Sequence, residues 1–461
     1  MKSEEDLAKA GEPPGRQSCS AVAESLATDG FLSADVHPKP SEPAIHLNSG
    51  AYPRAELAPV SYRGFYFPGV DDNEWNDWRW QFRNRVTTLA GLDRFFPLTK
   101  DERQALAEVL HEFRLGITPY YLSLIDPRDP ADPLRMQTVP SMAEFLDRAS
   151  GEEDPLGEEQ FSPVPSIVHR YPDRCLLIAT NACALYCRYC TRKRIMHEGE
   201  APPPRSVLKA AVDYIARTPA IRDVIVSGGD PLTWSTDRIE DLLRDLRAIP
   251  HLEIIRIGSR VPVTLPQRIT PELCARLERY GPLWINVHFN HPREITAEAA
   301  LACDRLLRCG IPLNNQAVLL RGVNDDAATM KSLVHALMRI KVRPYYLYHC
   351  DQVHGAEHFR TTVEKGLEIM ESLRGHTSGL AIPTYVIDAP GGGGKIPIQP
   401  QYLLSYQGGR AILRNFQDRI FHYRDPAQNG KGGGLRADQR KAPGNGNSGQ
   451  QRRAKDSTDP A

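Results

Sequence analysis

Short β-branched runs alternate with amphipathic stretches of helical length from Arg174 onward, and this alternation limits the possible fold more than any other feature. The predicted strands are Cys175–Ala179, Asp223–Ser227, Glu253–Gly258, Leu283–Phe289, Pro312–Leu319 and Val342–Tyr348. The predicted helices between them are Ser206–Arg217, Asp237–Ala248, Pro271–Tyr280, Ala297–Cys309 and Ala327–Ile340. This order predicts an α/β fold in which parallel strands form an open or closed barrel. Functional residues are then expected at the carboxyl ends of the strands.

Three cysteines follow the first predicted strand at the spacing C-x3-C-x2-C, namely Cys183, Cys187 and Cys190. Clustered thiolates are typical ligands of iron–sulfur clusters, because one loop can then wrap one cluster. Three thiolates hold three irons of a four-iron cluster and leave the fourth iron open to an outside ligand. A zinc loop is the competing interpretation, but a structural zinc normally takes four protein ligands. The spacing resembles that of radical S-adenosylmethionine (SAM) enzymes, in which SAM binds the open iron and is cleaved to a 5′-deoxyadenosyl radical.

A chain of 461 residues has room for two or three domains, or for one large α/β domain with extensions. Basic and acidic residues number 57 each, so the net charge does not point to nucleic acid or to a membrane as a partner. Nine cysteines, with three in one motif, argue against a secreted disulfide framework and for the cytoplasm. The first residues lack the apolar core of a signal peptide, and no run approaches the roughly 18 apolar residues of a membrane-spanning helix.

The part of the chain before the barrel is predicted to be helical. Glu74–Leu89 carries an apolar stripe at helical spacing, and a second helix is predicted from Thr99 to Phe113. Ile117–Pro140 is rich in proline and aspartate and is predicted to cross the surface in an extended form. A further strand-like run, Leu380–Asp388, follows the barrel.

A glycine pair follows the second predicted strand, in Ser227, Gly228, Gly229 and Asp230. Glycines allow a backbone to approach a ligand closely, and a carboxylate can accept a hydrogen bond from an ammonium group. The sequence GGD alone is weak evidence, and a bare turn would explain it. Its place one strand after the cysteine loop matches the radical SAM motif that contacts the methionine amine of SAM.

Four consecutive glycines, Gly391 to Gly394, precede Lys395. Because such a run costs folding entropy without a packing return, a structural role alone explains it poorly. A loop that presents one lysine suits an aldehyde cofactor, since lysine forms Schiff bases with pyridoxal 5′-phosphate (PLP). The alternative of a nucleotide phosphate loop fails because Ile396 follows the lysine.

Together these motifs resemble the lysine 2,3-aminomutase family, and the likeness runs from about Glu74 to Pro426. The matching stretches are EWNDWRWQ, HRYPDRCLL, CALYCRYCTRKR, SGGDPL, IRIGSRVPV, LPQRIT, NVHFNHPREIT, NNQAVLLRGVND, RPYYLYHCD, HFRT, LRGHTSG, DAPGGGGK and ILRNF. The resemblance implies a partial (β/α)6 barrel, a [4Fe–4S] cluster, SAM and PLP, with Lys395 carrying PLP. It also implies a homo-oligomer and an electron donor of the flavodoxin or ferredoxin type.

The chain is predicted to consist of five parts. These are a disordered extension at 1–60, a helical region at 61–165, the radical SAM barrel at 166–380, a PLP-lysine segment at 381–426 and a disordered basic tail at 427–461. The tail is rich in glycine, glutamine and arginine, and solvated disorder is favoured there over contact with nucleic acid.

The resemblance also implies roles for further residues. Arg192 matches the arginine that grips the substrate carboxylate, and a planar guanidinium suits that group. Tyr171, Arg174 and Gln316 match positions that line or anchor PLP, with the arginine meeting its phosphate. Without the resemblance, Arg174 would be interpreted as part of a surface ion pair.

Asp351 and Asp388 match the two carboxylates that bind the distal ammonium of lysine in that family. Two acids at one site repel each other unless a cation lies between them. L-Lysine is therefore the predicted substrate and L-arginine the alternative, because a guanidinium pairs with carboxylates equally well. Glutamate is disfavoured, since its distal carboxylate would face two acids. A non-catalytic iron–sulfur protein is the alternative from another class.

Two features of the sequence bear on whether the chain binds a metal other than the cluster. Some family members build a zinc site from cysteines near the C-terminus, but this chain has no cysteine beyond Cys350, so no such zinc is predicted. His349, His354 and His358 lie close together in sequence, yet their spacing fits no standard ligand pattern. They are predicted to be surface residues or to support the site indirectly.

Overall fold

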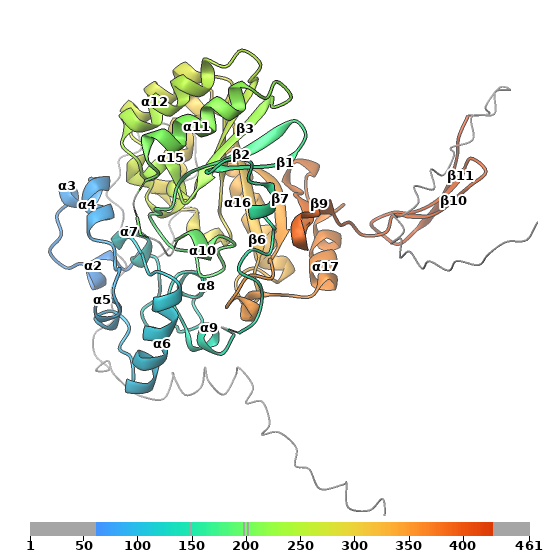
Figure 1. Cartoon of the computed structure of the whole chain (residues 1–461). Helices are drawn as coiled ribbons and strands as arrows, with labels where there is room; N and C mark the ends of the chain where they lie inside the picture. Colours follow the sequence, from blue (N-terminus) through green and yellow to red (C-terminus); the bar gives the residue numbers. More distant parts are fainter. Residues whose placement is uncertain (1–60, 148, 197–198, 201, 427–461) are drawn as a thin grey trace, which may run out of the picture. The chain divides into compact units, whose positions relative to one another are not determined.

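The computed structural model describes residues 61–147, 149–196, 199–200 and 202–426 (Figure 1). The two segments for which disorder is predicted, 1–60 and 427–461, lie outside the described residues. The chain forms two units, one ending at Pro400 and one beginning at Gln401, and each is described by itself.

The first unit is built on a nine-stranded sheet in which the strands lie side by side in sequence order. Its strands are β1 Ile167–Tyr171, β2 Arg174–Thr180, β3 Asp223–Gly228, β4 Ile254–Gly258, β5 Leu283–Val287, β6 Leu313–Leu319, β7 Arg343–His349, β8 Thr384–Ala389 and β9 Gly394–Pro397. Strands β2 to β8 are parallel, and β1 and β9 pair antiparallel at the two ends. No pairing joins β1 to β9 in the described part of the chain, so the barrel is partial, as predicted.

Helices follow most of the parallel strands and pack an apolar stripe against the sheet. They are α11 Arg205–Ala216, α12 Thr236–Arg247, α14 Pro271–Leu277, α15 Ala297–Arg308, α16 Ala327–Arg339 and α17 Val363–Leu373. In α12, the buried residues Ile239, Leu242, Leu243 and Leu246 recur at helical spacing, and the Ser235 side chain caps the first turn. Figure 1 shows α11, α12 and α15 outside the sheet. The six predicted strands and five predicted helices are confirmed, with ends shifted by a few residues.

Further helices, most of them short, connect these elements and form the region before the barrel. They are α2 Arg63–Tyr66, α3 Asp72–Asn76, α4 Trp78–Arg83, α5 Leu89–Asp93, α6 Lys100–Glu112, α7 Pro119–Leu122, α8 Pro133–Met136, α9 Met142–Asp147, α10 Lys193–Met196 and α13 Val261–Thr264. No helix in the described ranges is long and apolar enough to cross a membrane.

The predicted helix Glu74–Leu89 is wrong, because the segment is broken into α3, α4 and the start of α5. Asp77 leaves the helical conformation with ψ 110°, and its side chain caps α4 by accepting a hydrogen bond from the backbone N–H of Arg79. Val86 instead forms an antiparallel bridge with Ile117. The second prediction is confirmed by α6, which begins with a capping box between Thr99 and Glu102.

The prediction that Ile117–Pro140 crosses the surface in an extended form is also wrong. The segment contains α7 and α8, each with a proline in the first turn, and Tyr120 and Tyr121 are almost completely buried. Their hydroxyl groups find partners inside, Tyr121 donating to Glu294 at 2.7 Å. These partners remove the cost of burying the two hydroxyl groups.

The second unit contains a three-stranded antiparallel sheet, which was not predicted. Its strands are β10 Leu403–Gln407, β11 Arg410–Arg414 and β12 Ile420–Arg424. Large apolar side chains on it are exposed, including Leu403 at 51%, Tyr406 at 55% and Tyr423 at 58% of their surface.

Candidate active site

The cysteine loop lies between β2 and α10, at the carboxyl end of the first parallel strand, as predicted. Cys183, Cys187 and Cys190 are all free thiols. Arg260 Nη1 donates to Cys187 Sγ at 2.7 Å, and the backbone N–H of Arg192 lies 3.4 Å from Cys190 Sγ. Donors aimed at sulfur stabilise thiolate ligands.

Arg188, between the second and third cysteines, fixes the loop to the region before the barrel. Its side chain is completely buried and forms a bidentate pair with Glu144, with the closest contact at 2.7 Å. It also donates to the carbonyl oxygen of Arg114 at 2.7 Å and lies over the ring of Phe113. A buried charge with this many partners holds the loop in one conformation.

The donor set fits an iron–sulfur cluster better than a single ion. Three free thiols on one loop are a ligand set for such a cluster, whereas a structural zinc normally takes four protein ligands. Burial, together with the nearby Cys187, raises the pKa of Cys190 to about 11, so metal binding has to displace protons. His349 and His358 are engaged elsewhere, with Tyr385 and Asp147 respectively.

The glycines of the GGD motif allow β3 to touch the cysteine loop itself. Gly228 has φ +112°, and a Cβ there would lie 2.3 Å from the carbonyl oxygen of Thr180. A Cβ on Gly229 would lie 2.4 Å from the carbonyl oxygen of Ala182. The sequence analysis explains both glycines by a close approach to a ligand. In the structure, contact between two segments of protein backbone accounts for them.

Asp230 is buried, and its carboxylate already accepts four hydrogen bonds inside the protein. The donors are the Ser259 hydroxyl group at 2.7 Å and the backbone N–H groups of Arg260, Val261 and Leu232 at 2.7, 3.0 and 3.1 Å. Burial nevertheless raises the pKa of this carboxyl to about 6. These bonds tie the loop after β3 to the loop after β4.

A cavity of about 590 Å³ brings most of the other predicted site residues together. Those that line it are Tyr171, Arg174, Arg192, Ser227, Gln316, Asp351, Asp388 and Lys395. The cysteines, Gly228, Gly229 and Asp230 do not line it, but Thr191 and Arg192, which directly follow Cys190, do. Arg174 lies at the amino end of β2, so the cavity is not confined to the carboxyl ends of the strands.

Lys395 faces the acidic side of this cavity. Its Nζ lies 2.6 Å from Asp388 Oδ2, and Arg170 Nη1 lies 3.0 Å from Asp388 Oδ1. Asp351 lines the same cavity, and burial followed by repulsion from Asp388 raises the pKa of its carboxyl to about 7. Asp388 is thus already paired with two cations, whereas the pKa of Asp351 lies near neutral pH.

Arg192 is held by a buried glutamate that the sequence did not reveal. Its Nε and Nη2 donate to Glu158, with the closest contact at 2.7 Å. Burial opposes ionisation of Glu158, but Arg192 and Arg194 hold the pKa of this carboxyl down at about 2. The carboxylate in turn raises the pKa of Arg192 although burial acts in the opposite direction.

Of the three residues predicted to surround PLP, Tyr171 contacts Lys395 directly. The other two, Arg174 and Gln316, contact side chains that lie beside Lys395. Tyr171 OH accepts a hydrogen bond of 3.0 Å from the backbone N–H of Lys395. Arg174 stacks on Tyr171 at 3.9 Å and also pairs with Asp173 at 2.8 Å, which is the surface ion pair expected without the resemblance. Gln316 Nε2 donates to Tyr348 OH at 3.2 Å.

The glycine run before Lys395 has structural reasons, which corrects the argument made from the sequence. Gly391, Gly392 and Gly394 have φ of +63°, +86° and +83°, a region that favours glycine. A Cβ on Gly392 would lie 2.3 Å from the ring of Phe161, and one on Gly394 would lie 2.9 Å from Tyr171 OH. The run therefore makes a tight turn that brings Lys395 against Tyr171.

Several cavity residues were missed by the sequence analysis, among them Glu158, Arg170, Asn286 and His288. Asn286 and His288 alternate with apolar neighbours around β5, and this period of two was a usable signal for polar side chains that face the barrel interior. Burial and the nearby Arg260 lower the pKa of His288 to about 3, so its ring is neutral.

Two family models match this chain. Residues 177–333 match the model of the radical SAM superfamily, so barrel and cysteine loop together define a radical SAM enzyme. Residues 370–454 match a model described as lysine-2,3-aminomutase.

Curated relatives give the family. The L-lysine 2,3-aminomutase of Clostridium subterminale is 54% identical over 367 residues, which cover 80% of this chain and 88% of that protein. The L-lysine 2,3-aminomutase of Bacillus subtilis is 51% identical over 77% of this chain and 76% of that protein. The glutamate 2,3-aminomutase of Clostridioides difficile is 46% identical over 77% and 84%. This chain belongs to the lysine 2,3-aminomutase family of radical SAM isomerases, whose cofactors are a [4Fe–4S] cluster, SAM and PLP.

Proposed function

We propose that the enzyme moves the α-amino group of L-lysine to Cβ and so produces β-lysine. The observation that carries this proposal is the pair of carboxylates, Asp351 and Asp388, in the cavity that also holds Lys395 and Arg192. A substrate with cations at its far end compensates these acids. The glutamate-specific relative shows that the family includes another substrate, but a distal carboxylate would face like charges here. L-Arginine is the second candidate, because its guanidinium also suits the two acids.

The chain's own residues would hold the cofactors as follows. Cys183, Cys187 and Cys190 would ligate the cluster, and the segment Ser227–Asp230 would lie beside SAM. Lys395 would bind the PLP aldehyde, with Tyr171, Arg174 and Gln316 around it. When bound, the cluster and SAM supply a hydrogen-abstracting radical, and PLP supplies the group that carries the migrating amine.

The residues that face the substrate act by positioning. Nitrogen leaves Cα for Cβ, and one hydrogen moves from Cβ to Cα, so the reaction needs no net proton transfer to the solvent. Arg192 would bind the α-carboxylate, with Glu158 fixing the plane of its guanidinium. Asp351 and Asp388 would bind the distal ammonium, so that both ends of the substrate are held. Fixing reacting atoms in near-attack geometry is worth about 7–11 kcal/mol.

The Asp388 carboxylate is also suited to bind the distal ammonium group of the substrate. In the structure this carboxylate binds Nζ of Lys395 at 2.6 Å. Asp388 thus already accepts one ammonium group, and the distal ammonium of the substrate would lie between Asp388 and Asp351, which lines the same cavity. Arg170 would keep the Asp388 carboxylate in place throughout.

We further propose a homo-oligomer in the cytoplasm that receives electrons from a protein of the flavodoxin or ferredoxin type. The apolar side chains exposed on β10–β12 support self-association, because exposed apolar patches of this kind usually mark an interface. A low-potential iron–sulfur centre needs an external one-electron donor and a reducing compartment.

An anaerobic assay tests the substrate. Purified enzyme with reconstituted cluster is given dithionite, SAM and PLP, with lysine, arginine and glutamate in parallel, and the products are separated by chromatography. We expect β-lysine as the main product. Product from arginine or glutamate alone would overturn the substrate, and absence of a 2,3-shifted product from all three would overturn the aminomutase proposal.

The raised pKa of Asp351 predicts how lysine binding depends on pH. Because the carboxyl titrates at about 7 and binds the substrate cation only when ionised, KM for lysine should fall as pH rises from 6 to 8. In Asp351→Asn this fall should disappear, and KM at pH 8 should rise by about tenfold or more, the value of one charge-assisted hydrogen bond. The exposed Asp129→Asn serves as the control and should keep the wild-type profile. An Asp351→Asn enzyme with an unchanged profile would contradict the assignment.

A further inference from the structure

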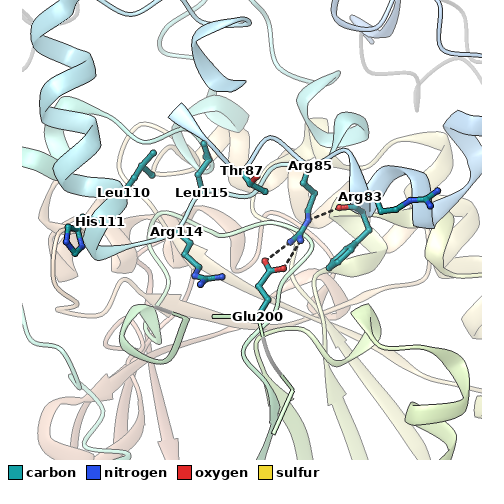
Figure 2. Close-up of a pocket in the computed structure, with 9 residues that line it drawn as sticks. Arg83, Arg85, Thr87, Leu110, His111, Arg114, Leu115 and Glu200 are labelled. Carbon is teal, nitrogen blue, oxygen red and sulfur yellow. Dashed lines mark hydrogen bonds and ion pairs between the residues drawn. The ribbon is translucent and has the colours of Figure 1, made fainter. Parts of the chain in front are cut away.

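One cavity is lined by residues of the cysteine loop and two others lie beside the loop, and the three linings differ in charge. The cavity with Lys395 meets the loop at Thr191 and Arg192, after the third cysteine. A second, of about 430 Å³, is lined by three acids, Glu112, Glu144 and Glu153, together with Lys193 and Arg194. The third, of about 720 Å³, is the arginine pocket shown in Figure 2; it is lined by Phe82, Arg83, Arg85, Thr87, Leu110, His111, Arg114, Leu115 and Glu200.

The arginine pocket reaches the first cluster cysteine through a single side chain. Arg85 donates from Nη1 to the carbonyl oxygen of Cys183, and its guanidinium also pairs with Glu200 at 2.8 Å. Tyr186, in the same loop, donates to Glu200 at 2.6 Å. Arg85, which lines the pocket, is therefore hydrogen-bonded directly to Cys183, a proposed ligand of the cluster.

The charge of the pocket lining is positive. Three arginines and a histidine face one glutamate, and that glutamate is already paired with Arg85. Figure 2 shows Arg83 and Arg114 on opposite sides of the Arg85–Glu200 pair. Glu112, which directly follows His111 along α6, lines the acidic cavity instead. The lining of the arginine pocket therefore attracts an anionic surface, whereas the lining of the acidic cavity carries more acids than bases.

We propose that the arginine pocket is the docking site of the enzyme's electron donor, a small electron-transfer protein with carboxylates around its redox centre. In this step the donor is oxidised by one electron, the cluster is reduced by one electron, and no atom is transferred. Electron-transfer complexes are small and transient, so charge complementarity dominates their formation. The arginine pocket and the cavity with Lys395 share no lining residue, so a donor docked in the pocket would not occupy the substrate cavity. The inference rests on the proposed function.

The test reverses the two outer charges of the pocket and measures binding as well as reduction. The double variant Arg83→Glu/Arg114→Glu, the milder Arg83→Gln/Arg114→Gln and the control Arg217→Glu, exposed at the end of α11, are prepared as cluster-loaded full-length enzyme. Affinity for a reduced flavodoxin, and in a parallel series for a reduced ferredoxin, is measured by titration at low and high salt. Bleaching of the cluster absorbance is followed with each protein donor and with dithionite.

We expect the double reversal to weaken donor binding by at least about tenfold at low salt, with a smaller effect for the glutamine variant and none for the control. Reduction by dithionite should be unchanged in all of them. Unchanged affinity for both donors in both pocket variants would overturn the docking site, as would an equal loss in the control. Failure of the aminomutase proposal is recognised separately, because it would leave the wild-type enzyme without product under dithionite.

Discussion

Replacing Lys395 with alanine is expected to lower kcat by at least about 10⁴-fold while leaving the iron content unchanged. Lys395 is the single lysine that lines the substrate cavity in the described residues, so no other amine there can hold the PLP aldehyde. Its side chain makes no contact with the cysteine loop; its partner is Asp388, at 2.6 Å. The measurements are turnover of lysine under dithionite, iron per chain, and absorbance of bound PLP.

Lys395→Arg is the matched variant that separates covalent binding from electrostatics. Arginine keeps a cation beside Asp388, but its guanidinium does not form a Schiff base under these conditions. We expect it to be as inactive as the alanine variant and to lose the absorbance of covalently held PLP. Lys365 on α17 is partly exposed and pairs with Glu368, and Lys365→Ala should behave like the wild type. Turnover retained in Lys395→Arg would contradict the role assigned to this lysine.

The barrel could be predicted because each of its strands has a recognisable local sequence pattern. Strand β6 alternates buried and half-buried residues along its whole length, and such a pattern needs no knowledge of the neighbours. The region before the barrel was not predictable in the same way. The bridge between Val86 and Ile117 joins segments that no local pattern connects, and it overrides the helical stripe of Glu74–Leu89. Burial of Tyr120 and Tyr121 likewise depends on partners far along the chain.

The same division applies to the site. Motifs carried on one loop or at one strand end, such as the cysteines and the turn before Lys395, could be found from the sequence. The pairs that set the electrostatics could not, because Glu158 is 34 residues from Arg192, and Arg170 is 218 residues from Asp388. The reason for the glycines was also hidden, since it lies in contacts with Phe161 and Tyr171 that only the folded chain creates.

Removing one cysteine of the loop should have an effect as large as removing Lys395, by a different route. Cys187→Ala takes away one of the three proposed cluster ligands, so we expect iron per chain to fall below about a tenth of the wild-type value and turnover to disappear. The fold should survive, because Arg260, which loses Cys187 as an acceptor, keeps Glu294 at 2.6 Å and Gln137 at 2.7 Å.

The control for this variant is Cys303→Ala, a buried thiol in α15 that belongs to the main core and not to the loop. It should keep the iron, the electron paramagnetic resonance signal of the reduced cluster and most of the activity. Binding of PLP gives an independent readout, since Lys395 and Tyr171 are untouched in both variants and both should retain its absorbance. Loss of PLP together with iron in Cys187→Ala would mean that the loop supports the whole cavity, whereas full iron in this variant would show that the three thiols do not ligate the cluster together.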